Sequence, residues 1–439
     1  MVKLVNRAKM TTASTGSGTI TLGSASDGYQ TFADAGVSNS DVVRFVIEDG
    51  DAWELSSGTY TASGTTLTRT LGESSTGSLL NLTGSAVVFV TAAAADIGLT
   101  LIKENYTSGT APTASGNGSI VLGKDAYSTG TNTVAIGSQA NAAPNNSIAI
   151  GELSATSNGY RQIALGYNSR AYAQEAIALG ASYAGGISSL AGAIANNSSS
   201  YGATNTGSIA MGNINKAAGY ESFVAGGYAN AANNYRSFVI GGNGNTVSTN
   251  YGAILGGEGN TVNSSSNYGV ILNGEYNEIN RAYTVASGKR AKTTVDGQVA
   301  HSAGHFASAG DAQGSKFILR AATTDATATA LTTTLSTASA YNQIVAASDT
   351  CITFDGTITA MQNGAQAFAS WRIEGLLVND GGTTTLANSS TTVIDNQSDW
   401  VMALSADDTN NALAITCTGE ASHNIRWVAN IRTTEVTYA

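Results

Sequence analysis

A five-residue phrase recurs through the middle of the chain, and this repeat constrains the fold more than any other feature. Two clear copies are Ser-Ile-Ala-Ile-Gly at 147–151 and Gln-Ile-Ala-Leu-Gly at 162–166. Thirteen copies follow one another every 14 to 17 residues. In chain order the copies end at Gly123, Gly137, Gly151, Gly166, Gly180, Asn196, Gly212, Gly226, Gly241, Gly256, Asn273, Ser287 and Ser302. Repetition this regular predicts a stack of similar structural units.

A second, shorter phrase lies between successive copies, as in GYNSRA from Gly166 and GNGNTV from Gly242. Both phrases alternate apolar with small or polar residues, which is the period of a β-strand. The chain has 51 glycines and only two prolines, a composition that favours short strands joined by tight turns. We expect glycine and asparagine to take the turn positions, where a positive φ costs them little.

A coil of two short strands cannot bury an apolar face alone, so the coils must stack. At the spacing between strands, thirteen coils give a rod roughly 60 Å long. Within each phrase the alanine points to one side and the branched residues to the other. We expect the smooth alanine face to pack against a neighbouring chain, because a thin roll has a small core that oligomerisation would stabilise.

The phrase and its spacing resemble the left-handed β-roll of trimeric autotransporter adhesin heads, over residues 118–302. The resemblance implies a parallel homotrimer with three rolls side by side about a threefold axis. Such autotransporters also have a signal peptide, a coiled-coil stalk and a membrane barrel, and the sequence shows none of these patterns.

Residues 1–97 have a different pattern, in which apolar and polar residues alternate. They are predicted to form a small all-β domain with turns at Asp49-Gly50 and Ser63-Gly64. The segment from "MVKLVNRAKM" to "DVVRFVIEDG" is similar to amino-terminal domains of tailed-phage tail fibres. That resemblance implies a domain that attaches the fibre to the phage tail or baseplate. Residues 98–117 are polar and are predicted as a linker before the roll at 118–304.

Residues 305–439 alternate clearly in "ALAITC" and "IRWVANIRTTEV" and are predicted as a β-sandwich. The strand "WRIEGL" and the terminal "IRWVA" are similar to carboxy-terminal domains of phage tail fibres, which implies a receptor-binding tip. The predicted fold class is therefore all-β: an elongated homotrimer with an amino-terminal β domain, a central left-handed β-roll and a carboxy-terminal β-sandwich.

Charge and motif content exclude several classes of function. The net charge of −10 argues against a nucleic-acid partner. The longest apolar stretch, residues 86–95, is too short to span a membrane as a helix. No metal or redox spacing occurs, and no cofactor is expected. Cys351 and Cys417 lie in strand-like contexts typical of buried free thiols, although a disulfide could form in an oxidising compartment.

Three groups of residues are candidates for function. His301 and His305 end the roll, where a trimer could hold a metal ion between copies, although a polar cap over the core is the simpler interpretation. Tyrosines precede successive phrases and predict an aromatic column, which stacking alone would explain: Tyr160, Tyr220, Tyr235, Tyr251, Tyr268 and Tyr283. The candidate receptor-binding residues of the tip are Asp399, Trp400, Asp407, Asp408 and His423. The two adjacent aspartates suit a solvated turn better than a catalytic pair, and core packing suits Trp400 better than ligand stacking.

These features predict a phage tail fibre that binds a host-surface receptor, expected to be a glycan, through its carboxy-terminal tip. Such a protein would assemble in the host cytoplasm and reside in the virion tail. The sequence lacks a nucleophile elbow, a P-loop and a zinc signature, so we expect no enzyme activity. The alternatives are a tailspike that hydrolyses surface polysaccharide, a head or neck fibre, and a cell-borne trimeric adhesin.

Overall fold

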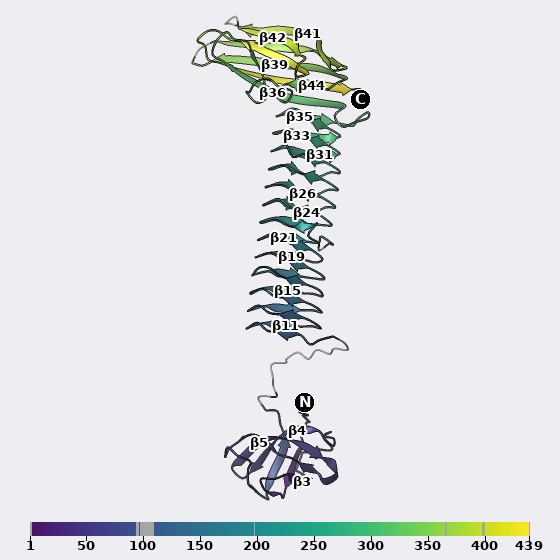
Figure 1. Cartoon of the computed structure of the whole chain (residues 1–439), viewed down its shortest axis with the longest axis vertical. Coiled ribbons are helices and arrows are strands. Elements are labelled where there is room, and N and C mark those ends of the chain that lie inside the picture. The colour runs from purple at the N-terminus through teal and green to yellow at the C-terminus, as the bar shows by residue number, and fades with distance from the viewer. Residues whose placement is uncertain are drawn as a thin grey trace. The chain divides into compact units, whose positions relative to one another are not determined.

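The computed structural model describes residues 2–93, 96, 109–196, 198–364, 367–396 and 400–438. Contacts divide the chain into two units, Met1–Asn105 and Tyr106–Ala439. Within the described residues every element is a β-strand, apart from one turn of 3-10 helix at Ala62–Gly64 (Figure 1). No helix in this part of the chain has the length and hydrophobicity needed to cross a bilayer.

The first unit is a sheet that closes on itself. Its strands run in the order β4-β9-β1-β3-β6-β5-β7, and β4 also pairs with β5, while β2 and β8 form a separate pair. The strands are β1 (Lys9–Thr12), β2 (Thr15–Gly16), β3 (Ile20–Ala25), β4 (Val42–Asp49), β5 (Ala52–Thr61), β6 (Thr66–Leu67), β7 (Thr70–Ser74), β8 (Leu82–Thr83) and β9 (Ala86–Val90). Both predicted turns are present: Gly50 adopts a positive φ between β4 and β5, and the 3-10 turn at Ala62–Gly64 precedes β6.

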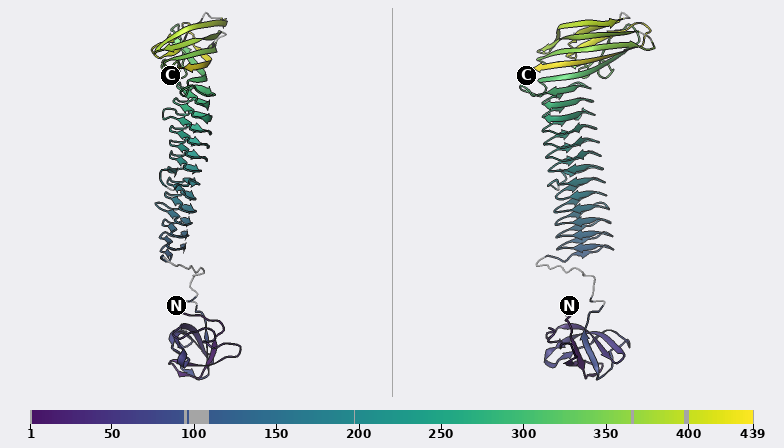
Figure 2. Two further views of the ribbon diagram at one scale, coloured as in Figure 1. Left: turned by 90° about the vertical axis from the view of Figure 1, so that its right-hand side faces the viewer. Right: turned by 180° about the vertical axis from the view of Figure 1, so that it is seen from behind.

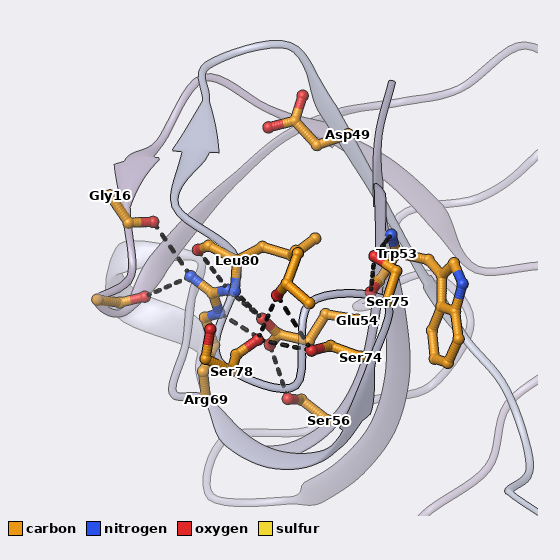
Figure 3. A network of polar contacts seen from close by, with 12 residues as sticks. Gly16, Asp49, Trp53, Glu54, Ser56, Arg69, Ser74, Ser75, Ser78 and Leu80 are labelled. Carbon is orange, nitrogen blue, oxygen red and sulfur yellow. Dashed lines mark hydrogen bonds and ion pairs between the residues drawn. The ribbon is translucent and has the colours of Figure 1, made fainter. Parts of the chain in front are cut away.

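A buried ion pair joins β5 to the segments around it (Figure 3). Arg69 contacts Glu54 through two nitrogens, and both side chains are almost fully buried. Ser56 Oγ and the backbone N–H of Leu80 also donate to the Glu54 carboxylate, each at 2.7 Å. Burial alone would raise the pKa of Glu54, but these donors outweigh it and hold the pKa below its ordinary value.

The second unit begins with the predicted roll, a stack of two-stranded coils (Figure 2). The phrases form one column of parallel strands, the phrase sheet: β11 (Ile120–Leu122), β13 (Val134–Ile136), β15 (Ile148–Ile150), β17 (Ile163–Leu165), β19 (Ile177–Leu179), β21 (Leu190–Gly192), β23 (Ile209–Met211), β25 (Phe223–Val224), β27 (Phe238–Val239), β29 (Ala253–Ile254), β31 (Val270–Glu275), β33 (Val285–Lys289) and β35 (Val299–Ser302).

The second phrases form a 13-stranded parallel column, the opposite sheet. Its strands are β10 (Thr113–Ala114), β12 (Tyr127–Ser128), β14 (Asn141–Ala142), β16 (Ala155–Thr156), β18 (Arg170–Ala171), β20 (Tyr183–Ala184), β22 (Gly202–Ala203), β24 (Lys216–Ala217), β26 (Ala231–Ala232), β28 (Thr246–Val247), β30 (Thr261–Val262), β32 (Glu278–Ile279) and β34 (Lys292–Thr293). The pairing of β10 with β12 places 113–114 in the roll rather than in the predicted linker, and linker residues 98–108 lie outside the described residues.

The glycine that closes each of the early phrases, such as Gly123, Gly137 and Gly151, is required by the stacking. Gly151 has a φ of 126°, and a Cβ added there would lie 2.4 Å from the carbonyl oxygen of Gly166 in the next coil. Two coils can therefore approach at the strand spacing only if the side chain is missing.

The central alanines face the inside of the roll, not a neighbouring chain as predicted. Ala135, Ala149 and Ala164 are fully buried within the single chain, while Ile150 and Leu165 are 38% and 36% exposed. The space between two strands of one thin coil admits only small side chains in these early coils. Later coils accommodate larger ones, with Val224 and Ile254 fully buried at the equivalent position.

The prediction is wrong for the sixth copy of the phrase. The strand that pairs with its neighbours is β21 at Leu190–Gly192, with Ala178 opposite Ala191, and not the GAIAN sequence that ends at Asn196. Ile194 of that sequence is fully buried, and its N–H donates to Ser182 Oγ at 3.1 Å. The extra residues of this coil therefore follow the strand instead of forming it.

Buried asparagines join the later coils in a ladder, where the sequence predicted turn residues with positive φ. Asn215, Asn230, Asn245, Asn260 and Asn277 are buried, and each of the last four donates its N–H to the side-chain oxygen of the previous one, at 2.8–3.0 Å. Asn245 Nδ2 also donates to the carbonyls of Gly241 and Gly257. The positive φ falls one residue earlier, as at Gly244. Asn168, by contrast, does adopt the predicted positive φ.

The phrase sheet continues without a break into the carboxy-terminal region. Strand β36 (Ala312–Thr323) pairs antiparallel with β35 and then with β44 (Ile425–Thr437). Strand β39 (Thr350–Gln362) follows β44, and β40 (Phe368–Asp380) and β41 (Thr383–Asn396) complete this sheet. A smaller sheet contains β37 (Thr329–Ala330), β43 (Ala412–Thr418), β38 (Ile344–Val345) and β42 (Val401–Asp407). One core draws on both sheets, with Trp371, Trp427 and Ile415 among its residues.

Candidate functional site

An apolar stripe runs along the outer face of the phrase sheet. The residues on either side of each core alanine point outward, and many are large and apolar. The most exposed members are Ile120, Ile150, Leu165, Phe223, Ile240, Leu255, Leu272 and Val299, at 36–54% exposure. Residues at one position pair in register from coil to coil, as Ile148 does with Ile163, so their side chains lie in continuous columns.

The opposite sheet carries no comparable stripe on its outward positions. These positions are mostly polar or small, with Asn141, Arg170, Lys216, Thr246 and Thr261 among them, and the aromatic side chains Tyr127 and Tyr183 lie separately between polar or small neighbours. Both sheets belong to the same thin roll, so the difference between their outer faces is not a consequence of the fold. A continuous apolar surface on only one face is typical of a protein–protein interface.

The predicted tyrosine column forms over five consecutive coils. The ring centroids of Tyr220, Tyr235, Tyr251, Tyr268 and Tyr283 follow one another at 5.5, 5.4, 4.9 and 5.2 Å. Three of these contacts are stacked within 10° of parallel, so the rings cover each other's faces. The column therefore stabilises the roll through ring stacking and offers few free faces to a sugar.

Tyr160 stands apart from that column. Backbone hydrogen bonds place Gln174, Ile187 and Thr206 between Tyr160 and Tyr220 along the stack. The guanidinium of Arg161 lies 5.4 Å from the Tyr160 ring centroid. The spacing of the tyrosines in the sequence does not show that the column is interrupted between Tyr160 and Tyr220.

The two histidines at the end of the roll lie on its surface. His301 is exposed on the outer face beside the stripe, where its Nδ1 lies 3.0 Å from Ser287 Oγ. The core of the last coil is closed instead by pairing of Ala300 with Ser315 of β36, so the polar-cap interpretation of His301 is wrong. His305 is also exposed. Within the described part of the chain, no three His, Cys, Asp or Glu side chains come together as metal ligands.

The candidate tip residues are not brought together. Asp407 ends β42, and Asp408 begins the turn that leads to β43. Asp407 accepts from the backbone and side chain of Asn410 within this turn, and Asp408 accepts from the N–H of Thr384 in β41. The first carboxylate therefore holds the turn, and the second joins the turn to β41. His423 lies between β43 and β44, at the other end of strand β43, and 3.1 Å from Glu420. Asp399 lies outside the described residues.

Trp400 is a core residue, which corrects its place among the receptor-binding candidates. Its side chain is 2% exposed, and its ring centroid lies 5.6 Å from that of Trp427. Trp371 stacks on Trp427 at the same distance, and Trp427 Nε1 donates to Thr323 Oγ1 at 3.0 Å. The three indoles form the centre of the carboxy-terminal core.

Both cysteines are free thiols. Burial raises the pKa of Cys417 to about 12, and its Sγ lies 3.4 Å from the carbonyl of Thr329. Cys351 is only partly buried, so the prediction of two buried thiols holds for Cys417 alone.

A family comparison supports the identification of the roll. The YadA head domain repeat matches the chain in two copies, at residues 128–151 and 163–182. Among solved structures, the chain is similar to the Acinetobacter baumannii phage AM24 tailspike protein, with 9% identity and a TM-score of 0.16. That alignment covers 72% of this chain and 58% of the tailspike chain. No curated protein sequence matches. The middle of the chain therefore consists of adhesin-type head repeats built into a β-solenoid.

Proposed function

We propose that the chain is a structural adhesin, the trimeric tail fibre of a tailed phage, which binds a host-surface glycan through its carboxy-terminal region. In this proposal the fibre assembles in the host cytoplasm and becomes part of the virion tail. The amino-terminal unit docks on a tail or baseplate protein. The resemblance of both ends of the sequence to phage fibre domains, on either side of adhesin head repeats, supports this assignment.

The apolar stripe is the observation that carries the proposal. Its branched and aromatic side chains are exposed in a single chain, and burial of such surface is the main driving force for association. Three copies about one axis would cover all three stripes at once and form a closed assembly. A rigid rod that presents three equivalent ends also suits attachment, since several weak contacts made together give strong binding.

The main alternative is a tailspike that cleaves surface polysaccharide. Catalytic glycoside cleavage generally requires two carboxyl groups placed about 5–10 Å apart across the bond. Asp407 and Asp408, the adjacent pair that the sequence suggested, instead accept hydrogen bonds within and beside one turn. This arrangement favours a fibre that binds its glycan without hydrolysis.

Incubation with purified bacterial surface polysaccharides tests this distinction. We expect the polymer to bind to the immobilised chain while the concentration of reducing ends stays at the level of a protein-free control. A steady release of reducing ends in proportion to protein concentration would establish the depolymerase instead. Heat-denatured protein serves as the second control.

A further inference from the structure

A groove lies near one end of the strands in the carboxy-terminal sheet. It has a volume of about 680 Å³ and forms where the ends of β36 and β39 and the start of β44 lie together. Ala322, Met361 and Val428 contribute apolar surface to it. The groove opens on the face of the sheet that is continuous with the apolar stripe, because Val299 of the stripe pairs with Lys316 of β36 and both are exposed.

The groove lies on a part of this sheet that extends beyond the roll (Figure 1). Strand β36 pairs with the last coil near Lys316, and Ala322 is six residues further along the strand. At the rise of an extended chain this is about 20 Å. The groove is therefore displaced sideways from the stripe that we assign to association of the chains.

Cations gather on the two strands of this face that adjoin the roll. The exposed positions of β36 and β44 hold four cations, Lys316, Arg320, Arg426 and Arg432, and no acidic residue. The next strands of the sheet, β39 and β40, add the exposed Asp355 and Glu374, which lie opposite each other. Arg320 donates to the carbonyl of Thr333 at 2.8 Å, and Arg432 lies 3.7 Å from Asp355. The side chain of Arg426 makes no hydrogen bond or ion pair within the described residues, and it lines the groove.

The remaining polar lining has the chemistry of carbohydrate recognition. Thr324 and Thr359 offer hydroxyl groups, while Gln362, Asn363 and Asn424 offer side-chain amides. None of the described residues that line the groove is acidic. Amides and hydroxyls exchange hydrogen bonds with sugar hydroxyls, apolar side chains contact the C–H faces, and a guanidinium matches a carboxylate in geometry and charge.

We infer that this groove binds a carboxylate-bearing polysaccharide, with Arg426 contacting the uronate or sialate carboxylate. The inference rests on the proposed adhesive function and names the class of glycan and the place where it binds. The neighbouring cations Lys316, Arg320 and Arg432 would attract the acidic polymer to this face, an effect that salt weakens.

Polygalacturonate is a suitable probe, and its highly methyl-esterified form is the matched control because it keeps the backbone and lacks most of the charge. We expect affinity electrophoresis of the full chain to show binding to polygalacturonate and little binding to the ester. Arg426→Gln should weaken the binding about tenfold or more, and Thr359→Asp, which adds a carboxylate to the groove, should weaken it as well. Arg432→Gln, on the same strand and face but outside the groove lining, should keep most of the affinity.

Three results would overturn the inference. The first is no binding of polygalacturonate by a chain that still binds another surface polysaccharide, which would leave the adhesive function intact. The second is equal loss in Arg426→Gln and Arg432→Gln, which would indicate diffuse attraction to the whole face. The third is equal binding of a DNA duplex that competes with the polymer, which would exclude selectivity for a saccharide. Circular dichroism of each variant verifies that the strands remain folded.

Discussion

At the scale of single residues, the pair of Glu54 and Arg69 is the most consequential charge placement in the described part of the amino-terminal unit. Both side chains are buried, and every strong donor around the carboxylate comes from this unit. Removing one partner of such a pair leaves the other charge buried without compensation, which is far more costly than losing a surface ion pair.

We predict that Glu54→Gln lowers the free energy of unfolding of this unit by about 3–5 kcal/mol at neutral pH. Hydrogen exchange of peptides from residues 42–90 in the full chain measures the effect locally. Glu48→Gln is the matched control, because Glu48 is partly exposed and its contact with Lys9 is long, at 3.5 Å. Unchanged exchange in Glu54→Gln would show that the buried pair does not stabilise the unit.

The same pair sets a pH dependence whose sign follows from the lowered pKa of Glu54. A carboxyl group with a lower pKa in the folded state stabilises the fold above its unfolded pKa, about 4.3 for glutamate. This contribution disappears as the pH falls below that value and through the folded pKa. Unfolding of this unit should therefore become easier on acidification in the native chain, and this loss should be smaller in Glu54→Gln.

At the scale of elements, the repeat can be recognised from the sequence. The sequence does not show, however, which residues of each strand face the core and which face outward. Alternation in Ser-Ile-Ala-Ile-Gly shows that alanine and isoleucine lie on opposite faces of a strand. Only the width of the coil decides that Ala149 fits inside and Ile150 remains outside. The register at Leu190–Gly192 cannot be read from the sequence for a similar reason, because Ala193 to Asn196 match the phrase in composition while the pairing uses the residues before them.

The asparagine ladder supplies the prediction at this scale. Replacing Asn245 with alanine leaves the carbonyls of Gly241 and Gly257 and the N–H of Asn260 without their buried partner. We expect a loss of about 3 kcal/mol or more in the free energy of unfolding, since each unsatisfied buried group costs about 1–3 kcal/mol. Chemical denaturation followed by circular dichroism measures it.

Two variants control this measurement. Asn243→Ala removes an exposed asparagine two residues away and should change stability little. Asn245→Ser should recover part of the loss, since Ser154 and Ser169 take the equivalent place in earlier coils and donate to the carbonyls of Gly151 and Gly166. If Asn245→Ala matched Asn243→Ala, the ladder would not be a source of stability.

At the scale of the whole molecule, the carboxy-terminal region shows why a binding site built from distant strands is difficult to predict from the sequence. Trp400, Asp407 and His423 are all predicted as receptor-binding residues of the tip, yet Trp400 is in the core and the other two lie beyond opposite ends of β43. The groove residues come from the strand ends of β36, β39 and β44, which are about forty to a hundred residues apart in the chain. Antiparallel pairing over such separations leaves no local pattern in the sequence.

The apolar stripe leads to a prediction about the association of the chains. Ile150→Asp with Leu165→Asp introduces two carboxylates into each stripe, and burying them against apolar neighbours would be very unfavourable. We expect this double variant to remain monomeric if the proposed trimer forms through the stripe, as light scattering would show. Thr246→Asp with Thr261→Asp, on the outer face of the opposite sheet, should leave the assembly intact. Dissociation in both would implicate the added charge rather than the stripe.

The central claim is that copies of the chain associate through the stripe, and the solution mass of the full native chain tests it most directly. Light scattering during size-exclusion chromatography should give three times the 44.3 kDa mass of one chain, with the early elution of an elongated particle. A mass of one chain over the whole concentration range would contradict the account, because the apolar stripe would then remain open to water.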